Sequence, residues 1–434
     1  MTTRLRCESC THELNELDTA TTCSKCGGLL SLENEAPADR NGALRATFDQ
    51  RLTPVAAKGV GDIVRSGVWR FRELVLPSIA DQDIVTQWEG NTPMLHRARV
   101  ADWAGMSELW LKHEGHNPTG SFKDRGMTVA VSNARRIGAR AVSCASTGNT
   151  SASLAAYAAL AEIPAIVFVP EGQIALGKLA QTLAYGARTL MVRGDFDACL
   201  RLAREASEKL GVYLVNSINP FRIAGQTTIV LDLLQQRGWK APDWIVVPAG
   251  NLGNTAAFGV ALRQARQLGL IDSSPRLAAV QAEGAAPFAQ SFRSGFAKRE
   301  TVHAETVATA IKIGDPASYE RGVRAIREND GVVLDVPDAE ILEAKAVIDA
   351  SGVGCEPASA ASVAGVRRLA RDGTIGKGES VVAVLTGHIL KDPGILIDFH
   401  KDAKERMANP PIEIDATTEA VARVIESTGR GPRQ

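Results

Sequence analysis

The sequence has no excess of either charge, no long apolar run and few cysteines for its length. Its 49 lysine and arginine residues balance 49 aspartate and glutamate residues, so no global charge favours nucleic acid or an anionic membrane as a partner. Seven cysteines in 434 residues, four of them in two Cys-x-x-Cys pairs, argue against a disulfide scaffold and for a reducing compartment. The N-terminal MTTRLRCESC lacks the apolar segment of a signal peptide. We therefore expect a soluble, cytoplasmic protein without a membrane partner.

Short apolar runs alternate with Ala-rich helical stretches through most of the chain. Strands are expected at residues 141–145, 165–169, 189–192, 212–215, 244–247, 277–281 and 381–385. Helices are expected at 196–210, 224–237 and 255–268, and from residues 338 and 358. This repetition predicts an α/β fold with two open parallel sheets that meet at a cleft. Such sheets bind ligands at the carboxyl ends of their strands.

The stretch HNPTGSFKDRG, His116 to Gly126, contains the most informative lysine. Lys123 lies in a turn rich in Gly, Pro and Asn, and a helix is expected to run from Asp124 towards Arg135. An amine at this place could form a Schiff base with the aldehyde of pyridoxal phosphate (PLP). A lone lysine is more often a surface residue paired with a neighbour such as Asp124, so the assignment depends on three later loops.

Each of these three loops follows an expected strand. STGNT begins at Ser146 and precedes an Ala-rich helix, so Ser146 and Thr147 could bind a substrate carboxylate, and Asn149 could donate to the cofactor's ring oxygen. GNLGN also precedes a helix, and its glycines allow the backbone to approach a phosphate; its residues are Gly250, Asn251, Leu252, Gly253 and Asn254. Thr386 ends the last strand, where its hydroxyl could meet the pyridine nitrogen.

Taken together, GSFKDRG, STGNT, GNLGN and LTGH resemble the fold-type II PLP enzymes, whose architecture is that of the tryptophan synthase β chain. WEGNTPMLHR, HNPTGSFKDRG, NSINPFRIAGQ and VLTGHILKDP are most similar to the threonine synthases. The resemblance runs from about Ser66 to about Asp398. It implies Lys123 as the Schiff-base residue and Asn149 at the phenolic oxygen. It also implies residues 250–254 around the cofactor phosphate and Thr386 at the pyridine nitrogen.

The resemblance also implies an activity, namely a PLP-dependent carbon–oxygen lyase that converts O-phospho-L-homoserine and water to L-threonine and phosphate. It assigns the substrate phosphate to Asn216, Ser217 and Arg222 in NSINPFRIAGQ. A guanidinium binds phosphate oxygens through paired hydrogen bonds, which suits Arg222 to this role. Without the cofactor motifs, the same stretch would be a helix cap followed by a surface arginine. A homodimer is the family expectation.

Four cysteines near the N-terminus have the spacing of a metal site. Cys7, Cys10, Cys23 and Cys26 form C-x2-C-x12-C-x2-C, and four thiolates suit tetrahedral Zn²⁺. A redox function is the alternative, but two Cys-x-x-Cys pairs without a surrounding βαβ pattern argue against it. The segment carries more acidic than basic residues, which favours a structural role over nucleic-acid binding.

These observations predict a zinc ribbon at 1–33, a linker at 34–65 and a C-terminal extension at 401–434. The large PLP domain is expected to comprise 66–123 and 216–400, and the small domain 124–215. Within the same fold, a cysteate synthase acting on phosphoserine and sulfite, or a threonine or serine dehydratase, is an alternative. A non-catalytic zinc-ribbon protein that regulates or binds nucleic acid is the alternative of another class. For Lys312 and Glu356, which lie in loop-like sequence, no role follows from the sequence.

Overall fold

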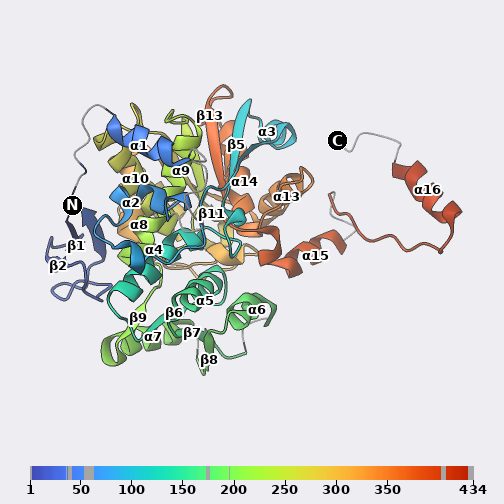
Figure 1. Cartoon of the computed structure of the whole chain (residues 1–434). Helices are drawn as coiled ribbons and strands as arrows, with labels where there is room; N and C mark the ends of the chain where they lie inside the picture. Colours follow the sequence, from blue (N-terminus) through green and yellow to red (C-terminus); the bar gives the residue numbers. More distant parts are fainter. Residues whose placement is uncertain are drawn as a thin grey trace. The chain divides into compact units, whose positions relative to one another are not determined.

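Two sheets covered by helices form most of the chain, and a third, small sheet lies at its N-terminus (Figure 1). The computed structural model describes residues 2–35, 37, 42–52, 63–172, 176–194, 196–401 and 407–428. The chain divides into two units, residues 1–392 and 393–434. The second unit holds α15 (Pro393–Lys401) and α16 (Thr418–Thr428).

The larger sheet has six strands, of which the first five are parallel and the last is antiparallel to its neighbour. Their order is β12 (Val332–Val336), β11 (Arg276–Ala282), β10 (Trp244–Pro248), β13 (Ser380–Leu385), β5 (Glu108–His113) and β4 (Met94–His96). The central strands β10 and β13 are almost entirely buried. Burial on both faces explains why their sequences are continuous apolar runs rather than alternating patterns.

The smaller sheet has four parallel strands, ordered β8 (Arg188–Val192), β7 (Ala165–Pro170), β6 (Ala141–Ala145) and β9 (Val212–Leu214). Its helices are α5 (Asn149–Ala161), α6 (Leu176–Ala184) and α7 (Phe196–Leu210), and they lie with this sheet in the lower part of Figure 1. These strands have nearly the predicted bounds. The two parallel sheets therefore confirm the predicted fold class.

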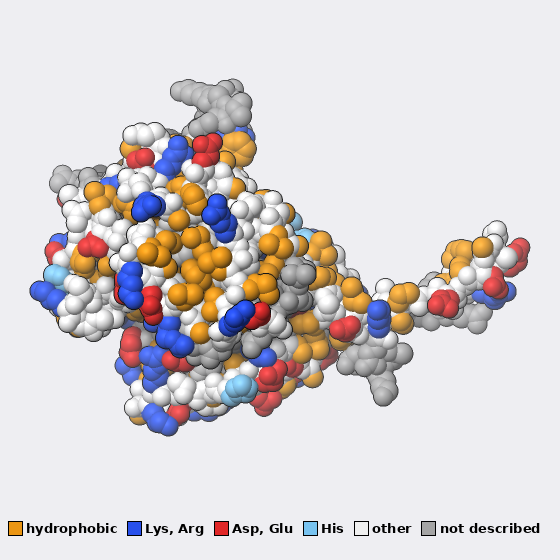
Figure 2. All heavy atoms as spheres, turned by 90° about the horizontal axis from the view of Figure 1, so that it is seen from below, with side chains coloured by type: hydrophobic (Ala, Val, Ile, Leu, Met, Phe, Trp, Pro, Cys, Tyr) orange, Lys and Arg blue, Asp and Glu red, His pale blue; other side chains and the backbone are white. Residues whose placement is uncertain are grey.

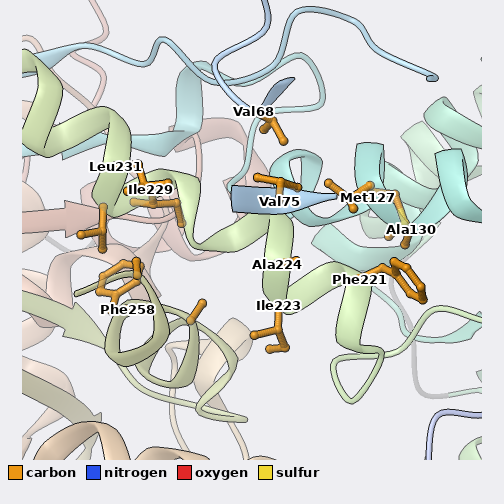
Figure 3. Packing of buried hydrophobic residues seen from close by; sticks show 14 of the residues in the cluster. Val68, Val75, Met127, Ala130, Phe221, Ile223, Ala224, Ile229, Leu231 and Phe258 are labelled. Atoms are coloured by element: carbon orange, nitrogen blue, oxygen red, sulfur yellow. The ribbon is translucent and has the colours of Figure 1, made fainter. Parts of the chain in front are cut away.

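Helices α4 (Lys123–Arg136) and α8 (Pro220–Gln226) cross at very short distance. A Cβ atom at Gly225 would lie 2.0 Å from the backbone oxygen of Arg125, so only glycine permits this crossing. Figure 3 shows Phe221 of α8 beside Ala130 of α4 in the buried core. The crossing brings the first turn of α4, which begins with Lys123, close to Arg222.

Three sequence predictions need correction here. The single helix expected at 224–237 is two helices, α8 and α9 (Thr228–Gln236). Helix α8 begins earlier than predicted, because the Asn219 side chain accepts hydrogen bonds from the Phe221 and Arg222 amides and Pro220 occupies the first helical position. Strands β4, β5 and β12 of the larger sheet were not predicted. The remaining helices are α10 (Gly253–Gln267), α11 (Pro287–Arg293), α12 (Tyr319–Glu328), α13 (Asp338–Asp349) and α14 (Pro357–Arg371).

The N-terminal sheet has the order β2 (Glu13–Asn15), β1 (Thr3–Cys7), β3 (Leu30–Asn34) and is antiparallel. Its acidic residues join it to the body of the protein. Arg321 on α12 donates from Nε to Glu8 Oε1 at 2.6 Å, and Arg136 on α4 donates from Nη2 to Glu16 Oε1 at 2.6 Å. Two acidic residues of this segment, Glu8 and Glu16, therefore pair with arginines of the body.

The predicted linker at 34–65 contains a helix, α1 (Ala43–Leu52), and its first residue, Asn34, belongs to β3. Residues 36, 38–41 and 53–62 of this linker, and residues 402–406 and 429–434 of the predicted extension, lie outside the described residues. The domain bounds given above remain a prediction. Short helices α2 (Arg72–Val75) and α3 (Ala98–Ala104) complete the fold. Among the described residues, no helix is both long and apolar enough to cross a membrane.

Candidate active site

A cavity of about 1280 Å³ lies where strands of both parallel sheets end. The residues predicted for cofactor and substrate all line it, namely Lys123, Ser146, Thr147, Asn149, Asn216, Ser217, Arg222, Gly250, Asn251, Leu252, Gly253, Asn254 and Thr386. Since the carboxyl ends of parallel strands are where such folds bind ligands, this cavity is the candidate active site. The individual roles of these residues remain predictions.

Lys123 is the first residue of α4, and the loop before it is fastened to the end of β13. The Phe122 amide donates to the Thr386 backbone oxygen at 3.0 Å, and the His388 amide donates to the Gly120 oxygen at 2.9 Å. Burial, reinforced by the positive charge of Arg222, lowers the pKa of Lys123 to about 7. Near neutral pH a large fraction of this amine is therefore unprotonated and able to act as a nucleophile or base.

Asp124 stabilises the same loop through hydrogen bonds. Its Oδ1 atom accepts from the hydroxyls of Thr119 and Ser153, each at 2.6 Å, and its Oδ2 atom accepts from the Thr119 amide at 2.7 Å. Burial raises the pKa of the Asp124 carboxyl to about 6. Its contacts are therefore with the loop and α5, and no ion pair joins it to Lys123 among the described residues.

The loop after β6 leads into α5, whose first turn offers backbone N–H groups to the cavity. The Asn216 side chain steadies this strand end, since it accepts from the Ala145 amide and donates to the Ala145 oxygen, both at 3.0 Å. Asn149, the first residue of α5, donates from Nδ2 to Glu356 Oε2 at 2.9 Å. Asn149 and Asn216 are thus both oriented by hydrogen bonds to other protein groups at the wall of the cavity.

The glycine-rich loop after β10 leads into α10. Leu252 adopts a left-handed conformation with φ of 62°, and the helix begins at Gly253. Asn254 Oδ1 accepts from Gln226 Nε2 at 2.7 Å, which ties this loop to α8. The first turn of this long helix leaves its backbone N–H groups available to an anion, and the helix dipole favours negative charge there.

Arg222 is buried, with 1% of its surface exposed, and yet it lines the cavity. It donates from Nη1 to the Val215 oxygen at 3.0 Å. No carboxylate lies within ion-pair distance of it in the described part of the chain, and its Nε atom has no hydrogen-bond partner there. Burial lowers the pKa of this guanidinium to about 10. Its charge is therefore largely uncompensated beside the Lys123 amine.

Glu356 and Ser359 also lie within hydrogen-bond distance of the Thr386 hydroxyl, and neither was assigned a role from the sequence. Glu356 lines the cavity, and its Oε1 atom accepts from Thr386 Oγ1 at 3.1 Å. Ser359 Oγ lies 2.9 Å from the same hydroxyl. The sequence EPAS at the start of α14 was the available signal, but only the fold brings it to the end of β13. Lys312 also lines the cavity and pairs with Glu305.

The four N-terminal cysteines form a separate cluster. Their Sγ atoms all lie within 4.8 Å of one another. The Ser9 and Cys10 amides point to Cys7 Sγ at 3.4 and 3.5 Å, and the Lys25 amide points to Cys23 Sγ at 3.4 Å. N–H groups directed at sulfur stabilise thiolates, which are the form that binds metal. The cluster could hold one tetrahedrally coordinated ion.

Comparison with known proteins gives a consistent result. The family model described as pyridoxal-phosphate dependent enzyme matches residues 85–387. The threonine synthase of Methanosarcina acetivorans is 42% identical over 423 residues, which cover 97% of this chain and 98% of that protein. The threonine synthase of Methanocaldococcus jannaschii is 39% identical over 97% of this chain and 99% of that protein. The solved structure of Escherichia coli threonine synthase shares the fold, with a TM-score of 0.70 at 18% identity and coverage of 98% of this chain and 100% of that one.

Proposed function

This chain belongs to the PLP-dependent enzymes and, within them, to the threonine synthases, and we propose that its Lys123 cavity converts O-phospho-L-homoserine and water to L-threonine and phosphate. The observation that carries the substrate assignment is Arg222. A buried guanidinium without a carboxylate partner is costly unless an anion joins it. The leaving phosphate of the substrate is such an anion, and Arg222 lines the same cavity as Lys123.

Several features of the cavity suit PLP. Lys123 has an amine whose pKa is lowered to about 7, as attachment to an aldehyde requires. Residues 250–254 and the first turn of α10 would hold the cofactor phosphate, because their N–H groups favour an anion. Asn149 and Thr386, which both hydrogen-bond to the Glu356 carboxyl, would contact the phenolic oxygen and the nitrogen of the cofactor ring, respectively. When bound, the cofactor supplies the electron-withdrawing group that allows carbon-bound protons to leave.

Residues of the chain would transfer the protons and bind the substrate. Lys123 Nζ would take the proton from Cα and then one from Cβ, and would return protons later, since an amine with a pKa near 7 can both accept and release them. Arg222, together with Asn216 and Ser217, would hold the phosphate while it leaves Cγ. Ser146 and Thr147, at the start of α5, would hold the substrate carboxylate before water adds to Cβ.

The direct test is the product formed by the PLP-loaded protein. With O-phospho-L-homoserine we expect equimolar phosphate and L-threonine, and with phosphoserine plus sulfite we expect neither phosphate nor cysteate. Lys123→Ala should lose both turnover and the visible absorbance of the lysine-bound cofactor. Activity on serine or threonine alone would favour a dehydratase, and product from phosphoserine and sulfite would favour a cysteate synthase. If Lys123→Ala keeps the visible absorbance of the bound cofactor, Lys123 is not the residue that attaches it.

We also propose that Cys7, Cys10, Cys23 and Cys26 bind one structural Zn²⁺. Support comes from the proximity of the four Sγ atoms and from the donors directed at two of them. Metal analysis should give one zinc per chain in the wild type and none in the double variant Cys23→Ser with Cys26→Ser. Equal zinc in both proteins would reject the site.

The proposed ribbon is expected to dock onto the body rather than to bind nucleic acid. Its arginines are already paired, since Arg4 and Arg6 both form ion pairs with Glu33. On the face seen in Figure 2, lysine and arginine side chains are interspersed with aspartate and glutamate around an apolar area.

A cytoplasmic location and a homodimer remain predictions. Sedimentation of the purified protein measures its oligomeric state.

A further inference from the structure

Glu356 lies in the wall of the cavity, and the proposed reaction assigns it no role. It immediately precedes α14, only 4% of its surface is exposed, and its amide donates to the Gly387 oxygen at 3.1 Å. A Cβ atom at Gly387 would lie 2.5 Å from the carboxyl group of Glu356. Residue 387 must therefore be glycine for the carboxyl to lie where it does.

The carboxyl group of Glu356 connects Asn149, which follows the end of β6 in the small sheet, with Thr386, which follows the end of β13 in the large sheet. Its Oε2 atom accepts from Asn149 Nδ2 at 2.9 Å, and its Oε1 atom lies 3.1 Å from Thr386 Oγ1. The amide group of Asn149 can only donate through its nitrogen. A proton on the carboxyl would therefore be carried by Oε1, on the side of Thr386.

Ser359 fixes the remaining hydrogen bond of the Thr386 hydroxyl. Ser359 Oγ lies 2.9 Å from Thr386 Oγ1 and accepts from the Gly387 amide at 3.0 Å. Among the described residues, Thr386 Oγ1 is the acceptor available to the Ser359 hydroxyl proton. Thr386 therefore accepts from Ser359, and one further lone pair and one proton of its hydroxyl remain to be divided between Glu356 and the cavity.

We propose that Glu356 is a positioning residue for the cofactor, and that its protonation decides whether Thr386 offers the ring nitrogen a proton or a lone pair. With Glu356 ionised, Thr386 donates its single proton to Oε1 and presents a lone pair to the cavity. With Glu356 protonated, Oε1 donates to Thr386, whose own proton then points into the cavity. This inference rests on the proposed function, because it takes Thr386 as the neighbour of the ring nitrogen.

The surroundings of Glu356 allow it to titrate above the usual range of a glutamate. Burial raises its pKa, while the hydrogen bonds from Asn149 and Thr386 and the charges of Lys391 and Lys123 act in the opposite direction. The neighbouring Cys355 thiol is buried, and burial raises its pKa so that it stays neutral. As the pH rises through the pKa of Glu356, Thr386 therefore withdraws its proton from the ring nitrogen.

The test follows the ring nitrogen itself. Wild-type protein loaded with PLP carrying ¹⁵N in the ring is titrated, and the ¹⁵N signal is recorded against pH. We expect the signal to shift with a single midpoint above the ordinary glutamate pKa of about 4.3. In Glu356→Gln, Asn149 fixes the amide oxygen on its own side, so the amide nitrogen donates to Thr386 at every pH. The shift should therefore be lost.

Lys391→Gln provides a second variant that leaves Glu356 and Thr386 intact. Removing the Lys391 charge should move the midpoint to higher pH, because that charge lowers the pKa of Glu356. If Glu356→Gln fails to fold or to take up PLP, the Lys391→Gln midpoint decides: an upward move supports the proposal, and an unchanged midpoint overturns it.

The two proposals can fail separately. If the ¹⁵N signal of Glu356→Gln shifts with pH as the wild-type signal does, the proposed role of Glu356 is wrong. The role is also wrong if the wild-type ¹⁵N signal does not change with pH while the enzyme still makes threonine. A wild type that does not bind PLP at Lys123 overturns the proposed function together with this inference.

Discussion

Two buried arginines on crossing helices differ in what surrounds them. Arg125 on α4 has no exposed surface and lies between two carboxylates, with Nε 2.7 Å from Glu114 Oε2 and Nη2 2.7 Å from Asp232 Oδ2. Arg222 on α8 is 1% exposed and has no such partner among the described residues. Accordingly, the pKa of Arg125 lies above its usual value despite burial, whereas burial lowers the pKa of Arg222 to about 10.

The comparison separates a structural arginine from one that is available to a ligand. Asp232 also pairs with Lys112 and Arg70, so the cluster around Arg125 links β5, α4 and α9 and fixes the start of the helix that bears Lys123. Such a cluster contributes a defined geometry rather than binding capacity. A buried charge left without a partner is tolerated where function requires an anion.

The largest expected effect is on stability, and it separates the two arginines directly. Arg125→Leu leaves Glu114 and Asp232 buried with too few partners, which should lower the free energy of unfolding by roughly 3–5 kcal/mol. Arg222→Leu removes a charge that has no carboxylate partner, so we expect a change within about 1 kcal/mol. Urea unfolding of the two variants, without phosphate or cofactor, measures both. Similar losses in both variants would show that Arg222 is structural as well.

A third arginine extends the comparison to the proposed zinc ribbon. Arg321 is 6% exposed and pairs with Glu8 of the ribbon. Glu8→Gln should lower the free energy of unfolding by roughly 1–3 kcal/mol, because it removes a charged acceptor from a nearly buried guanidinium. The matched control is Glu13→Gln, which removes an exposed pair with Arg4 in the same ribbon and should change little. Equal effects, or a fall in kcat/KM for the folded Glu8 variant, would contradict a docking role.

The smallest expected effect is a shift in pH dependence at Lys123. The amine reacts with PLP only when unprotonated, so the rate of attachment should rise with pH through about 7. The positive charge of Arg222 disfavours protonation of Lys123. Arg222→Gln should therefore raise the pKa of Lys123 and move the midpoint of attachment to higher pH, while Arg222→Lys should leave it near the wild-type value. Stopped-flow absorbance measures the midpoints, and a downward move in Arg222→Gln would contradict this explanation.

The fold class could be predicted from the sequence because most strands of the two main sheets are short apolar runs followed by turns. The strands of the small sheet were found with nearly the right bounds for this reason. Strands β4, β5 and β12 were missed. Met94–His96 is very short, Val332–Val336 is interrupted by Asp335, and Glu108–His113 contains charged residues. The α8 start was missed because the Asn219 cap was not used to place it.

The site was only partly predictable. Glycine-rich loops after strands indicated Lys123, residues 250–254 and Thr386, and all of them line one cavity. The sequence EPAS did not indicate a role for Glu356, because its partners Asn149 and Thr386 lie far from it in sequence and meet it only in the folded chain. The burial of Arg222 was likewise not readable from NSINPFRIAGQ, since it follows from the close crossing of α4 and α8.

The measurement that tests the central claim most directly is the turnover of O-phospho-L-homoserine by wild type and Arg222→Ala, both loaded with PLP. If Arg222 holds the leaving phosphate, the variant should lose roughly 2–4 kcal/mol in kcat/KM, which is a fall of about 30- to 900-fold. Its bound-cofactor absorbance should be unchanged, since the cofactor phosphate is assigned to residues 250–254. Equal kcat/KM in the two proteins would contradict this role of Arg222. Turnover of serine at the same rate by wild type and Arg222→Ala would contradict it as well.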